Sequence, residues 1–225
     1  MREAARSAHG IPFVWHTFDM RPELPSNWQT DILNVVDRES VSRVLISASV
    51  TSREISEDTR VPVQIVGGAA VARCLPWLHS MYHGRFRDIA QSLVKEPVSA
   101  AMDIRRGINL NVQYGNQHRY ECHVDSNPLE GLLYVTDHPP GSGGELVISN
   151  TGDVRGEEEI ARNATRIHPV AGHLIFFGAR RRSHYVTSLV DPNDTRVVAA
   201  MNFYLPSCTE DDRPEDLDKH LFGVD

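Results

Sequence analysis

Cysteine is scarce in this sequence. The three cysteines, Cys74, Cys122 and Cys208, are far apart and form no Cys-x-x-Cys pair. This spacing excludes a disulfide framework and a zinc knuckle, and it favours a reducing compartment. Cys122 does lie beside His123, but adjacent side chains on a strand point to opposite faces, so we do not expect it to share a metal with that histidine.

Long apolar runs and an excess of basic residues are also lacking. No stretch approaches the ~20 apolar residues that span a bilayer, and residues 1–10 are too polar for a secretory signal. The formal net charge of −7 offers no general attraction to nucleic acid or to anionic membrane. We therefore expect a cytoplasmic protein with a small-molecule substrate and with neither nucleic acid nor a membrane as partner.

The chain has 225 residues, enough for one domain with a substantial core. We expect a single domain over residues 1–225. It would comprise a mainly helical support region (1–97), a strand-rich core (98–207) and an acidic tail (208–225). The helical part is also available as a lid or as the contact of a homodimer.

Helical periodicity is strongest in the first part of the chain. Residues 28–36 predict a helix, and in residues 66–94 apolar side chains recur at three- and four-residue steps. Pro76 and Gly84 are expected to break this second run. Residues 41–50 fit either a strand or a short helix.

Strand patterns take over after residue 97. Residues 108–114 alternate apolar and polar side chains, which is the period of two that a strand shows. Short strands joined by Gly, Pro, Asn and Asp turns favour a barrel or a sandwich. The predicted strands are 108–114, 120–124, 131–136, 145–149, 172–177, 184–189 and 196–204.

His123 and Asp125 form a His-x-Asp pair within this region. Residues two apart on a strand face the same way, so an imidazole and a carboxylate can reach one ion. A histidine from a distant segment would complete a two-histidine, one-carboxylate triad, which binds one face of iron(II) and leaves positions open. The pair alone is weak evidence among eleven histidines, and the candidates for the third ligand are His138, His168, His173 and His184.

Further motifs follow the pair in a defined order. The ordered set resembles the iron(II)/2-oxoglutarate-dependent oxygenase family, and especially its prolyl-hydroxylase-like branch. No single motif is specific, but the order is, over about residues 108–205. The matching elements are Tyr114, Tyr120 with His123 and Asp125, Tyr134, Gly143–Leu146, Gly172–Phe177, His184 and Arg196.

The resemblance implies an α+β fold with a double-stranded β-helix (jelly-roll) core buttressed by the N-terminal helices. It implies iron(II), the cosubstrate 2-oxoglutarate and O2, with His184 as the distal ligand of iron. Arg196 would pair with the far carboxylate of 2-oxoglutarate, because its planar fork suits a bidentate contact. Tyr134 and Tyr114 would donate hydrogen bonds there. The sequence departs from the branch where Val198 replaces the usual hydroxyl.

Asp125 narrows the reaction that the resemblance implies. In related halogenases a small residue takes the place of the carboxylate, so that chloride can bind the iron. The carboxylate here favours hydroxylation of an unactivated C–H bond, or another oxidation without halide.

The substrate is less determined by the sequence. Arg181 and Arg182 precede the distal histidine, and Arg105 precedes the first core strand. These arginines form either a solvated basic loop or a clamp for a small anionic metabolite, such as an amino acid or its derivative. Asn111 either orients that substrate or faces water. A peptidyl or prolyl hydroxylase acting on a protein is the alternative.

Two other classes of function stay open. A cupin-like metal protein without 2-oxoglutarate would share the histidines but would have no use for Arg196 and Tyr134. A non-catalytic binding module would have kept the barrel and lost its activity. The complete ordered set favours the oxygenase over both.

Overall fold

The computed structural model describes residues 11–46, 60–116, 122–152, 154, 156–214 and 217. A large antiparallel sheet forms its centre, with strand order β1-β9-β6-β11-β5-β3-β2, and β4 pairs with the end of β11. The strands are β1 (Trp15–Asp19), β2 (Val41–Ile46), β3 (Arg60–Val66), β4 (Ser99–Ala100), β5 (Ile108–Tyr114), β6 (Leu129–Tyr134), β9 (His173–Phe177) and β11 (Thr195–Tyr204).

A small antiparallel sheet packs against one face of the large one. Its strand order is β10-β7-β8, from β7 (Leu146–Ser149), β8 (Ala164–Ile167) and β10 (His184–Val186). His123 extends this sheet by an isolated antiparallel bridge to His184. The two sheets face each other as in a jelly roll.

The central strand β11 separates two apolar cores, because its side chains alternate between faces. Val198 points between the two sheets, where it joins Leu132, Ile175 and Val186. Val197 and its odd-numbered successors point the other way, into the core shared with the helices. The even-numbered residues of β11, which include Arg196, therefore face the interior of the jelly roll.

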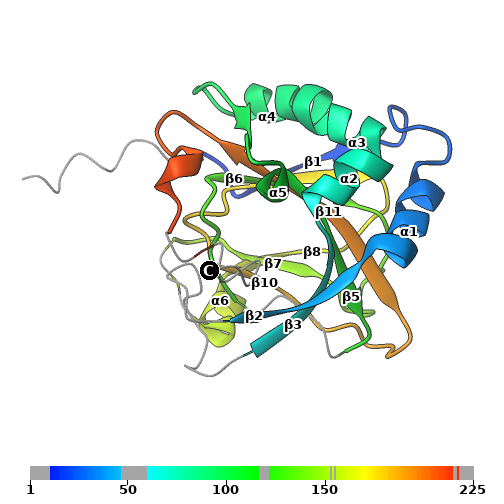
Figure 1. Ribbon diagram of the computed structural model, residues 1–225. Coiled ribbons are helices and arrows are strands. Elements are labelled where there is room, and N and C mark those ends of the chain that lie inside the picture. The colour runs from blue at the N-terminus through cyan, green and yellow to red at the C-terminus, as the bar shows by residue number, and fades with distance from the viewer. Residues whose placement is uncertain are drawn as a thin grey trace, which may run out of the picture.

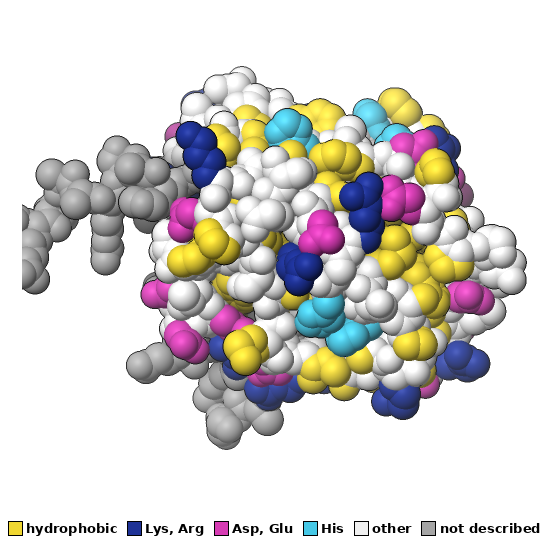
Figure 2. Space-filling model, turned by 90° about the horizontal axis from the view of Figure 1, so that it is seen from above, with side chains coloured by type: hydrophobic (Ala, Val, Ile, Leu, Met, Phe, Trp, Pro, Cys, Tyr) yellow, Lys and Arg dark blue, Asp and Glu magenta, His cyan; other side chains and the backbone are white. Residues whose placement is uncertain are grey.

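Helices cover the outer face of the large sheet, as Figure 1 shows for α2, α3 and α4. Over this face, in Figure 2, basic and acidic side chains lie interspersed. Among them are the ion pairs Arg85–Glu23 and Arg87–Asp88. The helices are α1 (Trp28–Glu39), α2 (Gly68–Cys74), α3 (Pro76–Met81), the π-helix η1 (Tyr82–Phe86), α4 (Arg87–Leu93), α5 (Ile104–Gly107), α6 (Glu157–Arg162) and the 3-10 helix η2 (Glu210–Asp212).

The predicted helices are found, with one error. Pro76 begins α3 after Leu75 has left the helical backbone, as expected. The predicted break at Gly84 is wrong, because Gly84 lies inside the π-helical turn that joins α3 directly to α4. In the described residues, no helix is long and apolar enough to cross a membrane.

The core strands are also found where the alternation predicts them. The first half of the 41–50 segment is strand β2, and its remainder lies outside the described residues. The predicted strand over 120–124 begins outside them too, and residues 122–124 form only the bridge at His123. Strands β1, β3 and β8 and helix α6 were not predicted.

Candidate metal centre

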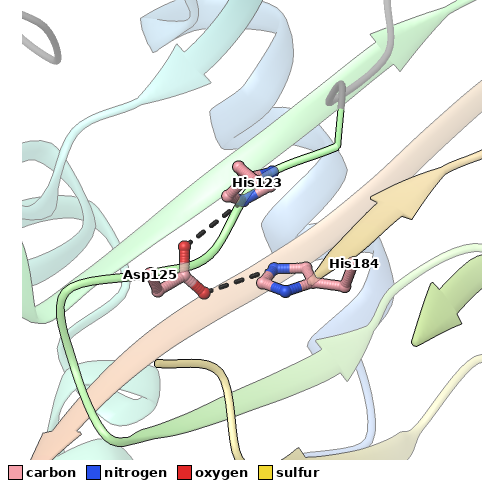
Figure 3. A group of neighbouring side chains, drawn as sticks. All are labelled: His123, Asp125 and His184. Carbon is pink, nitrogen blue, oxygen red and sulfur yellow. Dashed lines mark ion pairs between the residues drawn. The ribbon is translucent and has the colours of Figure 1, made fainter. Parts of the chain in front are cut away.

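His123, Asp125 and His184 converge at the bridge between the small sheet and the segment beside it (Figure 3). The carboxylate stands between the two imidazoles, with 3.3 Å from Oδ1 to Nε2 of His123 and 3.3 Å from Oδ2 to Nε2 of His184. One ligand atom from each residue lies within 4.8 Å of the others. In the described part of the chain, no other set of three His, Cys, Asp or Glu side chains converges in this way.

Backbone hydrogen bonds hold the three residues together. The bridge pairs the amide of each histidine with the carbonyl of the other, at 3.0 and 2.9 Å. The amide of Asp125 donates to the carbonyl of Ala179 at 3.2 Å. The His-x-Asp pair thus converges without lying on a regular strand.

The ring of His184 has a defined orientation. Its Nδ1 lies 3.0 Å from the carbonyl oxygen of Arg182, which can only accept, so Nδ1 carries the proton. In the neutral ring Nε2 then presents a lone pair toward Asp125. Phe177 packs edge-on against the same ring, with 4.8 Å between centroids. Such a bond to the second ring nitrogen is typical of metal-binding histidines.

The carboxyl of Asp125 is held ionised. Burial alone would raise its pKa, but in the metal-free protein the charge of a protonated His184 and hydrogen bonds from both protonated imidazoles outweigh burial and lower the pKa well below its usual range. An ionised carboxylate and neutral imidazoles are the states that bind a metal. The donor set of two imidazoles and one carboxylate fits a non-haem iron(II) centre.

The other candidate ligands lie elsewhere. Cys122 points to the outer face of the small sheet, where it packs with Val147 and Tyr185, as expected. His173 sits at the far end of β9, opposite Asp19 on β1. His168 lies 3.2 Å from a carboxylate oxygen of Glu145.

Arg196 occupies a buried pocket on the interior face of the large sheet. Its side chain is only 2% exposed, and Nε donates to the carbonyl of Gly144 at 2.9 Å. The guanidinium carbon lies 5.4 Å from the centre of the Tyr134 ring. Gln113 is directly opposite Arg196 on β5. The buried Tyr134 hydroxyl interacts with Arg196, and Gln113 Oε1 has no hydrogen-bond partner in the described residues, so polar atoms gather in this pocket.

The surroundings of Arg196 border the chain just after β10, the strand that carries His184. Gln113 Nε2 donates to the carbonyl of Thr187 at 3.1 Å, and Thr187 follows His184 by three residues. At ~3.3 Å per residue of strand the two points are about 10 Å apart. Gln113 therefore links the surroundings of Arg196 to the chain that carries His184.

Tyr114, predicted to bind the cosubstrate, is not in this pocket. It follows Gln113 on β5 and so points to the opposite face. There it packs against the helix-covered core and hydrogen-bonds with Ser40. The prediction for Tyr114 is wrong by one position, and Gln113 takes the place in the pocket.

His138, another candidate for the third ligand, does not join the three converging residues and is buried near Arg196. It is 3% exposed, and its Nε2 lies 3.2 Å from the carbonyl oxygen of Thr195. Burial lowers its pKa, and the charge of Arg196 contributes to the lowering. His138 thus lines the pocket as a neutral ring. The signal available in the sequence was its position just before the Gly143–Gly144 turn.

The residues predicted for the substrate are scattered. Arg105 is exposed and paired with Asp103 at 2.7 Å, and Arg181 is exposed. Arg182 donates to the carbonyls of Ser149 and Asn150, at 3.3 and 2.7 Å. The clamp of arginines is therefore not formed. Asn111 is half-buried on the same face of β5 as Gln113, so it faces the interior of the jelly roll.

Glu130 is a buried carboxyl that the sequence did not single out. It is 6% exposed on the interior face of β6, beside Phe177 on β9. Asn127 Nδ2 donates to its Oε2 at 2.8 Å and to the carbonyl of Leu129 at 2.9 Å. Burial raises the pKa of Glu130 well above its usual range, and the nearby charge of Asp125 raises it further.

Glu130→Gln is expected to flatten the pH dependence of stability of the metal-free protein. A carboxyl with a raised pKa binds more protons folded than unfolded, so the native protein loses stability as pH rises from the unfolded value of ~4.3 toward the folded one. Glutamine cannot ionise, yet it keeps an acceptor for Asn127. Urea unfolding at several pH values across about pH 4–8 measures the difference. If both proteins show parallel curves, Glu130 does not titrate in this way.

The sequence over residues 110–204 matches the family model of the 2OG-Fe(II) oxygenase superfamily. This match spans a little under half of the chain and contains all three converging residues, Tyr134 and Arg196. No curated protein sequence matches the chain.

Several solved structures share the fold of this chain. AviO1 from Streptomyces viridochromogenes Tue57 is 11% identical, with a TM-score of 0.61 over 87% of this chain and 91% of that one. The non-haem α-ketoglutarate-dependent epimerase SnoN from nogalamycin biosynthesis is 15% identical, with a TM-score of 0.58 over 94% and 86%. A prolyl-4-hydroxylase from Pseudomonas putida is 15% identical, with a TM-score of 0.50 over 85% and 92%.

These matches confirm the predicted fold, and the family-model match agrees with the predicted class over residues 110–204. The two facing sheets are a double-stranded β-helix. The matched family model is that of 2OG-Fe(II) oxygenases, and one solved structure of similar fold is the epimerase SnoN in complex with Fe3+ and α-ketoglutarate. The chain is therefore similar to the 2OG-Fe(II) oxygenase superfamily in the sequence of residues 110–204, and it shares the fold of the solved structures.

Proposed function

We propose that His123, Asp125 and His184 hold the iron(II), and that the enzyme hydroxylates an unactivated C–H bond of a small metabolite. One observation carries the proposal. Two imidazole nitrogens and a carboxylate converge within 4.8 Å, and the Nδ1 bond of His184 to a backbone carbonyl leaves its Nε2 free to bind. Two histidines and one carboxylate with open positions are typical of non-haem iron(II) oxygenases.

Arg196 and Tyr134 bind the far carboxylate of 2-oxoglutarate in this proposal. Arg196 is buried with its Nε tied to Gly144, so a carboxylate partner would relieve the cost of a buried charge. The Tyr134 hydroxyl is buried beside Arg196, so the two groups can bind one carboxylate together. Gln113 lies on the same wall.

The bound iron, 2-oxoglutarate and O2 together supply the oxidising chemistry. The chain's own residues bind, orient and exclude water. His184 is oriented by the carbonyl of Arg182 and by Phe177. Leu132, Ile175 and Val198 line the interior between the sheets and keep it dry. The carboxylate of Asp125 takes the position that halide would need, which favours hydroxylation over halogenation.

The substrate proposal is a small metabolite. The interior wall between the metal centre and Arg196 is apolar with a few amides, such as Asn111, a surface suited to a compact organic molecule. SnoN, which resembles this chain over 94% of its length, is named for nogalamycin biosynthesis. The prolyl hydroxylases of similar fold favour a peptidyl substrate as the alternative.

The first experiment is to add iron(II) and 2-oxoglutarate to the protein without oxygen and to record the visible spectrum. A weak metal-to-ligand charge-transfer band is expected, because a keto acid can chelate an iron that has open positions. Asp125→Ala should lose the band, and Arg196→Ala should need more 2-oxoglutarate to form it. Iron binding without a band at saturating 2-oxoglutarate would sink the cosubstrate assignment. Panels of small metabolites and proline peptides, scored by succinate release, then separate the two substrate classes.

A further inference from the structure

The three consecutive arginines before β10 have different surroundings. Arg181 is exposed, whereas Arg180 and Arg182 are half-buried. The two half-buried guanidinium groups both donate to backbone carbonyls. A solvated basic loop would leave all three in water, and a substrate clamp would direct them at one point. Neither describes this arrangement.

Arg180 holds the segment that carries the carboxylate. Its Nη1 donates to the carbonyl of Ser126, the residue after Asp125. The residue before it, Ala179, accepts the amide of Asp125 at 3.2 Å. Two consecutive residues of one segment thus bind two consecutive residues of the other. The second nitrogen, Nη2, lies 3.5 Å from the carbonyl of Asp212 in η2, so the same guanidinium also reaches the C-terminal segment.

Arg182 holds the segment that carries the distal histidine. Its Nη1 donates to the carbonyls of Ser149 and Asn150 at the end of β7. Its own carbonyl accepts the hydrogen bond from Nδ1 of His184. The side chain therefore anchors the residue whose backbone orients the metal-facing imidazole.

We propose that Arg180 and Arg182 are positioning residues of the metal centre, one for Asp125 and one for His184. The inference rests on the proposed iron site. It replaces the reading in which this run clamps an anionic substrate. Arginine suits the task because its forked donors serve two carbonyls at once. Partners behind the ligands of a metal typically contribute ~10- to 100-fold to its affinity.

The experiment compares Arg180→Ala and Arg182→Ala with Arg181→Ala as the matched control in the same run. The probe is Mn(II), a redox-stable stand-in for iron(II), and free Mn(II) is followed by electron paramagnetic resonance. The metal-free unfolding temperature of each variant is measured alongside. Arg180→Lys and Arg182→Lys, which retain one charged donor, serve where an alanine variant does not fold.

We expect ~10- to 100-fold weaker Mn(II) binding in both outer variants and a change within about twofold in Arg181→Ala. The Mn(II) affinity of the lysine variants should lie between that of the native protein and that of the alanine variants. A purely structural role would lower the unfolding temperature and leave Mn(II) affinity unchanged below it. Equal Mn(II) affinity in all variants, or an equal loss of affinity in Arg181→Ala, overturns this inference and leaves the proposed iron site standing. If the native protein binds no Mn(II) and no iron(II), the proposed iron site itself fails.

Discussion

Replacing His184 by alanine is expected to weaken iron(II) binding by more than ~100-fold, which exceeds the usual loss for a residue behind a ligand. The ring supplies one of the three converging atoms and is buried, so water cannot take its place in the same geometry. The loss of iron(II) affinity can be measured by thermal unfolding, without an activity assay. Iron at 100 times its Kd stabilises the native protein by ~2.7 kcal/mol, and the variant should lose this gain.

His173→Ala is the matched control for this prediction. His173 also lies on the interior face of the large sheet, but at the far end of β9, opposite Asp19. The control should keep both the iron-induced stabilisation and the charge-transfer band. Equal losses in the two variants, with both still folded, would show that His184 is not the distal ligand.

Arg196→Met is expected to raise the KM for 2-oxoglutarate by at least ~30-fold, because truncating one partner of a buried, hydrogen-bonded charge pair costs 2 kcal/mol or more. Methionine fills much of the same buried space without charge. The iron affinity should stay near its native value, since Arg196 lies on β11 and supplies none of the three converging ligand atoms. Titration of 2-oxoglutarate at saturating iron measures the effect.

A pair of tyrosine variants tests the same pocket more finely. Tyr134→Phe removes a buried hydroxyl beside Arg196 and should weaken 2-oxoglutarate binding by ~10- to 100-fold, the value of a hydrogen bond to a charged group. Tyr114→Phe should leave it unchanged, because Tyr114 faces the helix-covered core. A loss in Tyr114→Phe and none in Tyr134→Phe would contradict the assigned faces of β5 and β6.

The sequence predicted the jelly-roll strands well because their side chains alternate. It missed β3, which contains Pro62, a residue that lacks a backbone donor and argues against a strand. Pro62 is compatible with β3 because this strand pairs with β5 only through residues 64–66, and Pro62 lies beyond that stretch. Strand β1 was missed for a different reason. Its sequence, WHTFD, has no clear alternation, and its pairing with β9 is a contact of residues distant in sequence.

For the candidate site, the order of motifs predicted which residues converge. It failed where the outcome depends on which of two neighbouring strand residues faces the interior. Tyr114 and Gln113 are neighbours in sequence, and only the pairing of Gln113 with Arg196 reveals which of them enters the pocket. Glu130 and His138 depend on burial, which one sequence does not encode locally. In the sequence, Arg180–Arg182 form one run of like charge, whereas in the structure the three side chains have three different environments.

The hydrogen bond from His184 to the carbonyl of Arg182 has a consequence for how this protein can change over evolution. Metal-binding histidines are often oriented by a carboxylate side chain, which one substitution can remove. Here the acceptor belongs to the main chain, and every amino acid offers the same carbonyl. The acceptor for Nδ1 is therefore present whichever side chain residue 182 carries, although the Arg182 side chain anchors the segment that holds it in place. Laboratory selection for new substrates can vary the surrounding wall freely while this one feature of the centre stays constant.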